Sequence, residues 1–326
     1  MLALKCWCVL GYMFEVAAGD VSGLRLASER MSAFLARPRV LLLGDSLTEQ
    51  SVDFVQGGWA HLLAGYFSRR ADVIVRGFSG YNSQEIKEIL GAGGGERLAA
   101  RSSERDEYAL VVVMLGANDA VAPDRPAHVP LQQFMANMHD IVSALESELR
   151  PRSLALMATP PIHEESLNRL PWFAPDGRTL LRIGAYAQAS LDLAQRMRSE
   201  RPGACAEWLA APGLQRGPAF MAERRACIFG VDLYGSMMVE TGGKTDERYF
   251  VDGLHLSLDG NHFVFRTLVQ KLRGEFGWPN IADLNSGNWP ADAWKGLPIH
   301  FPHFPHILVP NRSCAWPNVQ GEYCMA

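Results

Sequence analysis

The sequence predicts an α/β fold with an open, mostly parallel sheet of about five strands and helices on both faces. Along the chain, short apolar runs alternate with amphipathic stretches, which is the pattern of strands separated by helices. The run at residues 111–115 is continuously apolar, as expected for a parallel strand that is covered on both faces. These two observations together predict the fold class.

Five strands are expected, each followed by a helix. The strands lie at residues 39–43, 72–75, 109–115, 154–158 and 227–233, and the helices at 58–69, 83–90, 130–150, 178–201 and 258–273. Ser83 is the expected N-cap of the second helix. Pro130 begins the third helix, at a position where its missing N–H costs nothing.

This pattern predicts one main domain over residues 38–275. Residues 1–37 lack clear periodicity and form an N-terminal extension. Residues 276–326 are rich in proline and tryptophan and form a C-terminal extension. The segment 203–226, rich in glycine, proline, alanine and arginine, is expected to be a surface insertion.

The composition is that of a globular protein: of 326 residues, 48% are hydrophobic and 20% are charged. A net charge of -4 and the absence of a basic block give no reason to expect a nucleic-acid partner. No apolar run approaches the roughly 18 residues that are needed to span a bilayer. Neither a nucleic-acid partner nor a membrane span is therefore expected.

The N-terminus and the cysteines bear on the cellular location. Lys5, the apolar run at 6–14 and the small residues at 16–18 resemble a secretory signal peptide, but the run is short and Glu15 interrupts it. The six cysteines form no Cys-x-x-Cys pair and no disulfide framework, so reduced thiols are expected. If residues 1–18 were cleaved, four cysteines would remain, a number compatible with two disulfides. These features predict a cytoplasmic protein, with secretion as the alternative if residues 1–18 are cleaved.

A serine follows the first predicted strand, within Gly44-Asp45-Ser46-Leu47. Its hydroxyl is expected at the carboxyl edge of the sheet, where the N–H groups at a helix start favour a developing oxyanion. The sequence is not the Gly-x-Ser-x-Gly elbow, because no glycine stands two places after Ser46. Taken alone, the serine also fits an ordinary N-cap.

Asp252 and His255 precede the last predicted helix, three residues apart. A histidine here can accept the Ser46 proton on one ring nitrogen, while the aspartate holds the other nitrogen. Taken alone, the pair also fits a solvated loop.

Two further elements can supply oxyanion donors. Gly80 follows the second strand, and Asn118 follows the third, each in a stretch that alone is a turn signal. A backbone N–H at Gly80 and a side-chain amide at Asn118 are donors of the type that stabilises an oxyanion. Ligands bind at the carboxyl edge of open α/β sheets, where all four elements are expected.

In this order, Gly44-Asp45-Ser46-Leu47, Gly80, Gly116-x-Asn118-Asp119 and Asp252-x-x-His255 resemble the blocks of the SGNH hydrolases, also called GDSL esterases. Residues 76–82, 115–119 and 252–257, with Gly260-Asn261, look most similar to the branch of isoamyl-acetate-hydrolysing esterases. The resemblance covers about residues 38–275.

The resemblance implies a three-layer α/β/α sandwich similar to flavodoxin, and a serine esterase. It implies Ser46 as nucleophile, His255 as general base and Asp252 as the acid that orients it. The oxyanion hole would be the N–H groups of Ser46 and Gly80 with the Asn118 amide. No metal and no organic cofactor are implied.

The expected substrate is a small carboxylic ester with a short acyl group, an acetate ester by resemblance. The alternatives are an acyltransferase or a lipase-like or lysophospholipase-like enzyme with the same site, or a non-catalytic binding module. The loops at 121–128 and 162–172 and the arm at 278–306 are the expected pocket walls.

Three other stretches invite a different interpretation. Residues 91–96 and 242–245 resemble nucleotide-binding loops, but each lacks a required glycine, so both are expected to be ordinary loops. His300, His303 and His306 share one face of a polyproline II helix, which suggests a metal site. A proline-fixed arm that packs its phenylalanines is the favoured interpretation.

Overall fold

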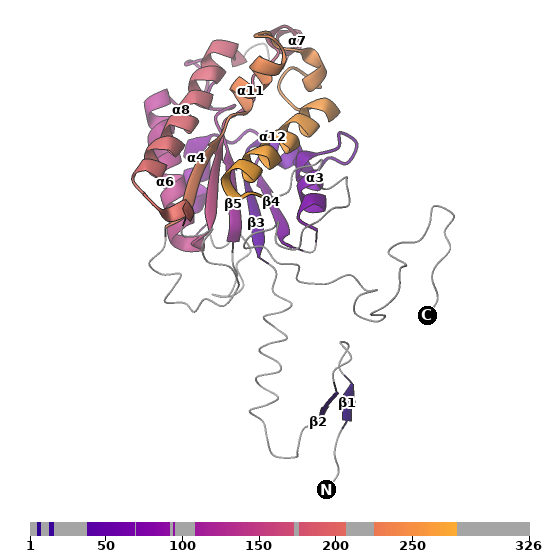
Figure 1. The fold of residues 1–326 in the computed structure, drawn as a ribbon. Helices are drawn as coiled ribbons and strands as arrows, with labels where there is room; N and C mark the ends of the chain where they lie inside the picture. The colour runs from indigo at the N-terminus through magenta and orange to yellow at the C-terminus, as the bar shows by residue number, and fades with distance from the viewer. Residues whose placement is uncertain are drawn as a thin grey trace, which may run out of the picture. The chain divides into compact units, whose positions relative to one another are not determined.

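Five parallel strands form the central sheet of the computed structural model (Figure 1). They are β3 (Arg39–Gly44), β4 (Asp72–Gly77), β5 (Tyr108–Met114), β6 (Ser153–Met157) and β7 (Cys227–Val231). The structure describes residues 38–68, 70–91, 94, 108–172, 176–206 and 225–278, with two short strands near the N-terminus. The predicted number of strands and their parallel arrangement are confirmed.

The strand order is β4-β3-β5-β6-β7, and each neighbouring pair is parallel. This order is the flavodoxin-like one that the sequence resemblance implies. The chain runs from β3 outward to β4, and then crosses back over β3 to β5. The loops after β3 and β5 therefore leave the sheet toward opposite faces, and a crevice is expected between them.

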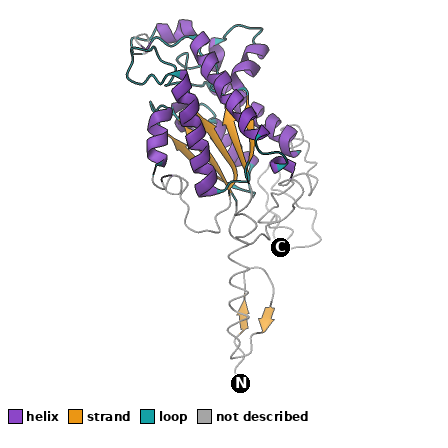
Figure 2. Ribbon diagram, turned by 90° about the vertical axis from the view of Figure 1, so that its left-hand side faces the viewer, coloured by secondary structure: helices purple, strands orange, loops and turns teal. Residues whose placement is uncertain are grey.

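Helices cover both faces of the sheet (Figure 2). One layer consists of α4 (Ser83–Leu90), α6 (Leu131–Leu149) and α8 (Leu180–Ser199), and the other contains α3 (Trp59–Tyr66) and α12 (Leu258–Phe276). Shorter helices are α2 (Ser46–Glu49), α7 (Glu164–Asn168) and α11 (Leu233–Glu240), with 3-10 turns η1 (Gln50–Val52) and η3 (Glu247–Tyr249). The three-layer sandwich is confirmed.

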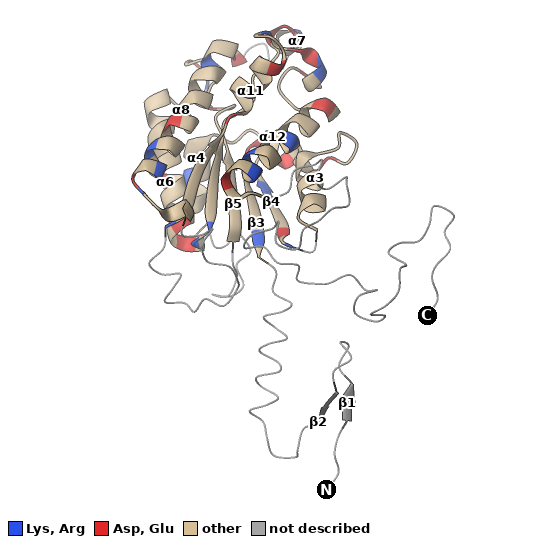
Figure 3. Ribbon diagram, in the orientation of Figure 1, with Lys and Arg blue, Asp and Glu red and all other residues tan. Residues whose placement is uncertain are grey.

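Burial explains why these segments form strands. Every residue of β5 and of β6 is buried, because helices cover both faces of the inner strands. In the edge strand β4, the residues are only half-buried or exposed. Figure 3 shows the charged residues mainly along the helices, with both signs interspersed.

Several expected caps and boundaries are wrong in detail. Pro130 is the N-cap of α6, which begins at Leu131, and α8 begins at Leu180 after its N-cap Thr179 rather than at residue 178. The N-cap of α4 is Asn82 rather than Ser83: the Asn82 side chain accepts from the Glu85 N–H, and the Glu85 carboxylate accepts from the Asn82 N–H. The last strand ends at Val231 rather than 233, because Asp232 caps α11 by accepting from the Gly235 N–H.

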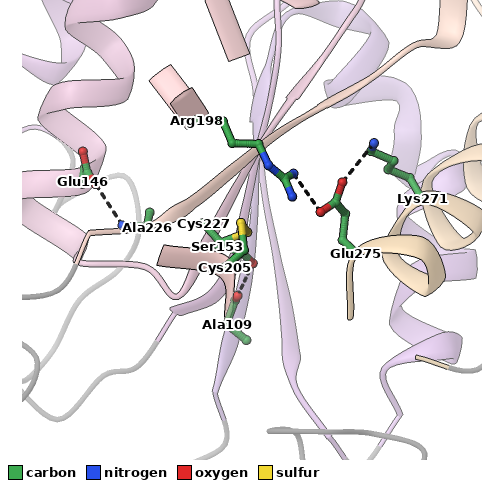
Figure 4. The surroundings of a disulfide bond; sticks show 9 residues. All are labelled: Ala109, Glu146, Ser153, Arg198, Cys205, Ala226, Cys227, Lys271 and Glu275. Atoms are coloured by element: carbon green, nitrogen blue, oxygen red, sulfur yellow. Dashed lines mark hydrogen bonds and ion pairs between the residues drawn. A yellow bond between two sulfur atoms is a disulfide. The ribbon is translucent and has the colours of Figure 1, made fainter. Parts of the chain in front are cut away.

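At the amino end of the sheet, a disulfide joins the segment after α8 to the first residue of β7 (Figure 4). The bond links Cys205 to Cys227, with a Cα–Cα distance of 4.5 Å. The expectation of reduced thiols is therefore wrong for these two cysteines. Residues 22 apart cannot be paired from spacing when no framework of cysteines guides the choice.

Some predictions lie outside the described residues. These are the interior of the 203–226 insertion, the arm beyond residue 278 and the three histidines within it. The chain divides into one unit over Pro38–Pro298 and a second made of Met1–Arg37 and Ile299–Ala326. In the second unit, β1 (Lys5–Trp7) pairs antiparallel with β2 (Met13–Glu15). None of the described helices is long and apolar enough to cross a membrane.

Candidate active site

Ser46 lies where β3 ends and α2 begins. Asp45 is the N-cap of α2, and its Oδ1 accepts from the Leu47 N–H at 2.9 Å. Ser46 is only 7% exposed, so its hydroxyl stands at the carboxyl edge of the sheet in a nearly enclosed position. Asp45 thus stabilises the turn that carries Ser46, because its side chain accepts a backbone hydrogen bond there.

The loop before α12 holds Asp252 and His255 in a fixed register. Asp252 Oδ1 accepts from the N–H groups of Leu254 at 2.9 Å and His255 at 2.7 Å. Gly253 has φ +91°, and a Cβ there would lie 2.5 Å from the Leu167 N. Only glycine adopts this conformation without strain and leaves room for α7. The intervening glycine therefore allows one loop to carry both functional groups.

A chain of hydrogen bonds joins Asp252, His255 and Ser46. Asp252 Oδ2 lies 2.6 Å from His255 Nδ1, and His255 Nε2 lies 3.0 Å from Ser46 Oγ. Because the carboxylate accepts the proton of Nδ1, Nε2 is left to accept a proton from the hydroxyl. The three predicted catalytic residues are brought together although Ser46 and His255 are 209 residues apart in the chain.

The charge on Asp252 is supported by its surroundings. Burial alone would raise the pKa of this carboxyl, but the hydrogen bonds from the ring and backbone of His255 and the Leu254 N–H outweigh it. The net effect lowers the pKa of Asp252 below its ordinary value of 3.8. An ionised carboxylate is the form that stabilises a protonated imidazole.

Asn118 and Gly80 lie in two loops that contact each other. The Asn118 amide donates through Nδ2 to the carbonyl of Tyr81 at 2.8 Å, so the loop after β5 meets the loop after β4. Gly80 has φ +84°, which turns the chain next to Tyr81. The Ser79 N–H donates to Glu49 Oε2 at 2.7 Å, which ties the same loop to α2. Both predicted donors thus belong to loops that are bonded to their neighbours.

Two other carboxyls are buried near the site. Burial raises the pKa of Asp45 from 3.8 to about 7, while the Leu47 N–H lowers it and nearby Asp119 raises it further. Burial also raises the pKa of Asp119 to about 6, against hydrogen bonds from the hydroxyl and N–H of Ser83. The raised pKa values of Asp45 and Asp119 distinguish them from Asp252, whose pKa is lowered.

Trp59 connects the helix of the serine to the helix after the histidine. Its Nε1 donates to the Leu47 carbonyl at 3.0 Å, and its backbone N–H donates to Asn261 Oδ1 at 3.1 Å. Asn261 in turn donates to the Ser257 carbonyl at 2.9 Å. These buried bonds hold α2 against the start of α12, so the distance between Ser46 and His255 is constrained on both sides.

Arg178 is a further residue of this region that no sequence motif marks. Its side chain is buried and its Nη2 donates to Asn118 Oδ1 at 3.0 Å. The two residues are 60 positions apart, and no spacing or motif links them in the sequence.

Metal ligation has little support among the residues that the structure describes. The group of potential ligands found there is Cys205, Cys227 and Glu275. The two cysteines form the disulfide, which leaves no thiolate to bind a metal ion. These residues also lie at the amino end of the sheet, away from Ser46.

The family model described as GDSL-like lipase/acylhydrolase matches residues 40–268, more than half of the chain. The chain belongs to this family. Its relatives include an isoamyl acetate-hydrolyzing esterase 1 homolog of Bos taurus, 35% identical over 72% of this chain and 81% of that protein. A GDSL esterase/lipase of Arabidopsis thaliana is 32% identical over 74% of this chain and 88% of the relative.

Among solved structures, a catalytic mutant of Axe2, an acetylxylan esterase from Geobacillus stearothermophilus, matches with a TM-score of 0.49 and 16% identity. The match covers 74% of this protein and 95% of the esterase chain. Membership of the GDSL family and the esterase-named relatives make the protein a carboxylic ester hydrolase.

Proposed function

We propose that the protein hydrolyses small carboxylic esters with a short acyl group, of the acetate type, through an acyl-enzyme on Ser46. The hydrogen-bonded chain from Asp252 through His255 to Ser46 is the observation that supports this mechanism most directly. The short acyl group is inferred from the relatives that are named as isoamyl acetate-hydrolyzing esterase homologs.

In the first half of the reaction, Ser46 Oγ attacks the ester carbonyl and its proton passes to His255 Nε2. The carbonyl oxygen becomes an oxyanion that accepts hydrogen bonds from the N–H groups of Ser46 and Gly80 and from the Asn118 amide. The bond to the alcohol oxygen then breaks, and His255 returns the proton to the leaving alcohol. Asp252 holds the imidazolium during these steps.

In the second half, water attacks the acyl group on Ser46. His255 accepts a proton from the water, and the new tetrahedral intermediate uses the same three donors. The bond to Ser46 Oγ breaks, the serine regains its proton from His255, and the carboxylic acid leaves. No metal or organic cofactor takes part in either half.

The test is labelling and substitution of the serine. A fluorophosphonate is expected to modify Ser46, and Ser46→Ala is expected to lower kcat on p-nitrophenyl acetate by about 10⁶-fold. Ser51→Ala is the matched control, since Ser51 lies on the same segment but donates its hydroxyl to the Thr48 carbonyl. Undiminished hydrolysis by Ser46→Ala would show that the proposed mechanism is wrong.

A second candidate is a lipase-like activity on longer acyl chains. Phe54 is 84% exposed and Val55 is 68% exposed, on the loop that follows the serine helix. A Cβ at Gly57 would lie 2.6 Å from Leu258 Cδ1, so this loop borders the start of α12, three residues after His255. Exposed apolar side chains at this rim suit an apolar chain. Rates on p-nitrophenyl esters of increasing acyl length separate the two candidates.

Transfer to another acceptor is a variant of the same proposal. An alcohol in place of water would attack the acyl group on Ser46 and would give a new ester. Adding a primary alcohol to the hydrolysis assay and measuring the ester formed against the acid released distinguishes a transferase from a hydrolase.

The disulfide bears on the cellular location. A bond between Cys205 and Cys227 is favoured in an oxidising compartment, which supports secretion over the cytoplasm. Thiol labelling of the protein taken directly from its native source decides between the two, because reduced Cys205 and Cys227 would both become labelled after unfolding.

A further inference from the structure

We propose that Arg178 is a positioning residue that holds the Asn118 amide in the orientation required of an oxyanion donor. This inference rests on the proposed function. Arg178 Nη2 donates to Asn118 Oδ1 at 3.0 Å, and Asn118 Nδ2 donates to the Tyr81 carbonyl at 2.8 Å. Both the oxygen and the nitrogen of the amide are thus hydrogen-bonded.

The chemistry of the partners determines which way the amide faces. A guanidinium has only donors, so the atom of Asn118 that meets Arg178 must be the carbonyl oxygen. A backbone carbonyl has only lone pairs, so the atom that meets Tyr81 must be the amide nitrogen. The NH₂ group has a second hydrogen, which has no acceptor among the described residues. That hydrogen is the one available to an oxyanion.

Arg178 is itself held rigidly. Its side chain is 5% exposed, its Nε donates to the Ala117 carbonyl at 3.0 Å, and its Nη1 pairs with Asp176 Oδ2 at 2.5 Å. The Ala122 N–H donates to the Asp176 carbonyl at 2.8 Å. The segment before α8 is therefore bonded at several points to the turn that carries Asn118.

The charge of Arg178 adds to its geometric effect. A guanidinium stays protonated, and a positive charge at Oδ1 polarises the amide, which makes its N–H groups stronger donors. An ammonium group carries the same charge but lacks the planar fork that reaches Asn118, Ala117 and Asp176 together. Arginine, rather than any cation, is the residue that this position requires.

The experiment is a double-mutant cycle between Arg178 and Asn118 with p-nitrophenyl acetate as substrate. Asn118→Ala is expected to lower kcat by about 10²- to 10³-fold, as loss of one oxyanion donor does. Arg178→Ala is expected to lower kcat by about 10- to 100-fold, because the misplaced amide donates poorly. In the Asn118→Ala background, Arg178→Ala is expected to cost about twofold or less, because its partner is already gone.

Arg182→Ala is the matched control. Arg182 reaches the same turn, where its Nη1 donates to the carbonyls of Gly177 and Ala120, but it does not bond to Asn118. This variant is expected to keep the kcat of the parent protein. An equal loss in Arg178→Ala and Arg182→Ala would mean that both residues only support the fold of the turn, and would overturn the proposal.

The variant Arg178→Lys covers the case in which Arg178→Ala does not fold, and a rescue experiment applies where it does fold. Arg178→Lys keeps the charge, and it is expected to lower kcat with little change in KM and to lose this effect in the Asn118→Ala background. Added guanidinium ion at millimolar concentration is expected to restore part of the kcat of Arg178→Ala, whereas sodium at equal ionic strength is not. If Arg178→Ala lowers kcat by the same factor in the Asn118→Ala background as in the parent protein, the two effects are additive in free energy and the proposed role of Arg178 is contradicted.

The outcome for Ser46→Ala separates this inference from the proposed function. If Ser46→Ala keeps its activity, the mechanism itself fails. If Ser46→Ala is inactive and the cycle is additive, Ser46 remains the nucleophile and only the role of Arg178 is rejected.

Discussion

At the amino end of the central sheet, the Glu146 carboxylate and the Ser153 hydroxyl have hydrogen-bond partners and a disulfide cross-links the chain, whereas at the carboxyl end several buried polar atoms of the described residues have no partner. On the amino side, Glu146 accepts from the Ala226 N–H at 2.9 Å and from Arg201 at 2.7 Å. The Ser153 hydroxyl donates to the Ala109 carbonyl at 2.7 Å, beside the disulfide (Figure 4). These polar groups at the amino end therefore all have hydrogen-bond partners.

On the carboxyl side, polar atoms are left without partners. Among the described residues, five buried side-chain nitrogen or oxygen atoms have no hydrogen-bond partner. Four of them follow strands at the carboxyl end: Asp45 Oδ2, Thr48 Oγ1, Asp119 Oδ2 and Thr159 Oγ1. The fifth, Arg201 Nε, belongs to a guanidinium whose other nitrogens are bonded.

The contrast shows which end of the sheet contains the buried polar groups that destabilise the fold. Buried unsatisfied groups destabilise a protein, and they persist where function needs them. The amino end is expected to contribute stability without activity, and the carboxyl end to contribute activity at the expense of stability. Three substitutions test this division.

The largest expected effect is at the carboxyl end. Asp252→Asn is expected to lower kcat on p-nitrophenyl acetate by roughly 10³- to 10⁴-fold, because the amide no longer holds Nδ1 of His255 protonated. Asp246→Asn is the control, since Asp246 is a nearby loop aspartate that caps η3 and pairs with Arg248. A kcat within a factor of about ten of the parent would contradict the role of Asp252.

The next effect is at the amino end. Replacing Cys205 and Cys227 together by alanine is expected to lower the free energy of unfolding by about 3 kcal/mol, because the bond closes a loop of 22 residues. The kcat of the folded protein is expected to stay unchanged, since Cys227 begins β7 at the end away from Ser46. Urea denaturation and steady-state assays measure the two quantities.

The reduced parent protein serves as the control for the disulfide. It retains both side chains, so it should lose stability as the double variant does if the covalent bond is responsible. A large loss of kcat without a loss of stability would break the proposed division between the two ends.

The third effect is a pH dependence of stability that comes from Asp45. Its folded pKa of about 7 lies above the unfolded value, so the folded state binds a proton more tightly. The free energy of unfolding therefore falls as the pH rises from about 4 to about 7. Asp45→Asn removes this loss while its side-chain oxygen can still cap α2. Its stability relative to the parent is expected to rise with pH, by about 1.4 kcal/mol for each unit of pKa difference.

Asp252→Asn is the control of opposite sign. The pKa of Asp252 is lowered in the folded state, so this group stabilises the fold above its unfolded pKa and loses that contribution as the pH falls. Urea midpoints from about pH 2 to about pH 8 compare the two variants, since the Asp252 contribution changes only below its unfolded pKa and the Asp45 contribution changes above its own. A constant difference between Asp45→Asn and the parent across that range would show that burial does not raise the pKa of Asp45.

Much of the fold could be predicted from the sequence, because parallel strands are apolar throughout and their helices are amphipathic. Ser46, Gly80, Asn118, Asp252 and His255 could be proposed together, because each follows or precedes an element whose carboxyl or amino end lies at one edge of the sheet. Local pattern and topology act in the same direction there.

The remaining features depend on contacts between distant residues. Asn82 competes with Ser83 for the cap, and the choice follows from Asp119, which binds the Ser83 hydroxyl and N–H. The contact between Arg178 and Asn118 exists only after α8 has packed against the turn after β5. Neither contact leaves a periodic signal in the sequence, so neither could be predicted from it.

The 209-residue separation between Ser46 and His255 has a consequence for synthesis and folding. The proposed nucleophile directly follows the first strand of the sheet, and its proposed base lies in the loop before the last helix. On this mechanism, almost the whole domain must be assembled before the first turnover. If His255 is the base, a nascent chain that has not yet released residue 255 from the ribosome is expected to be inactive, whatever part of the sheet has formed. Recovery of esterase activity during refolding therefore reports the closing step of the process, later than burial of β3 or β5.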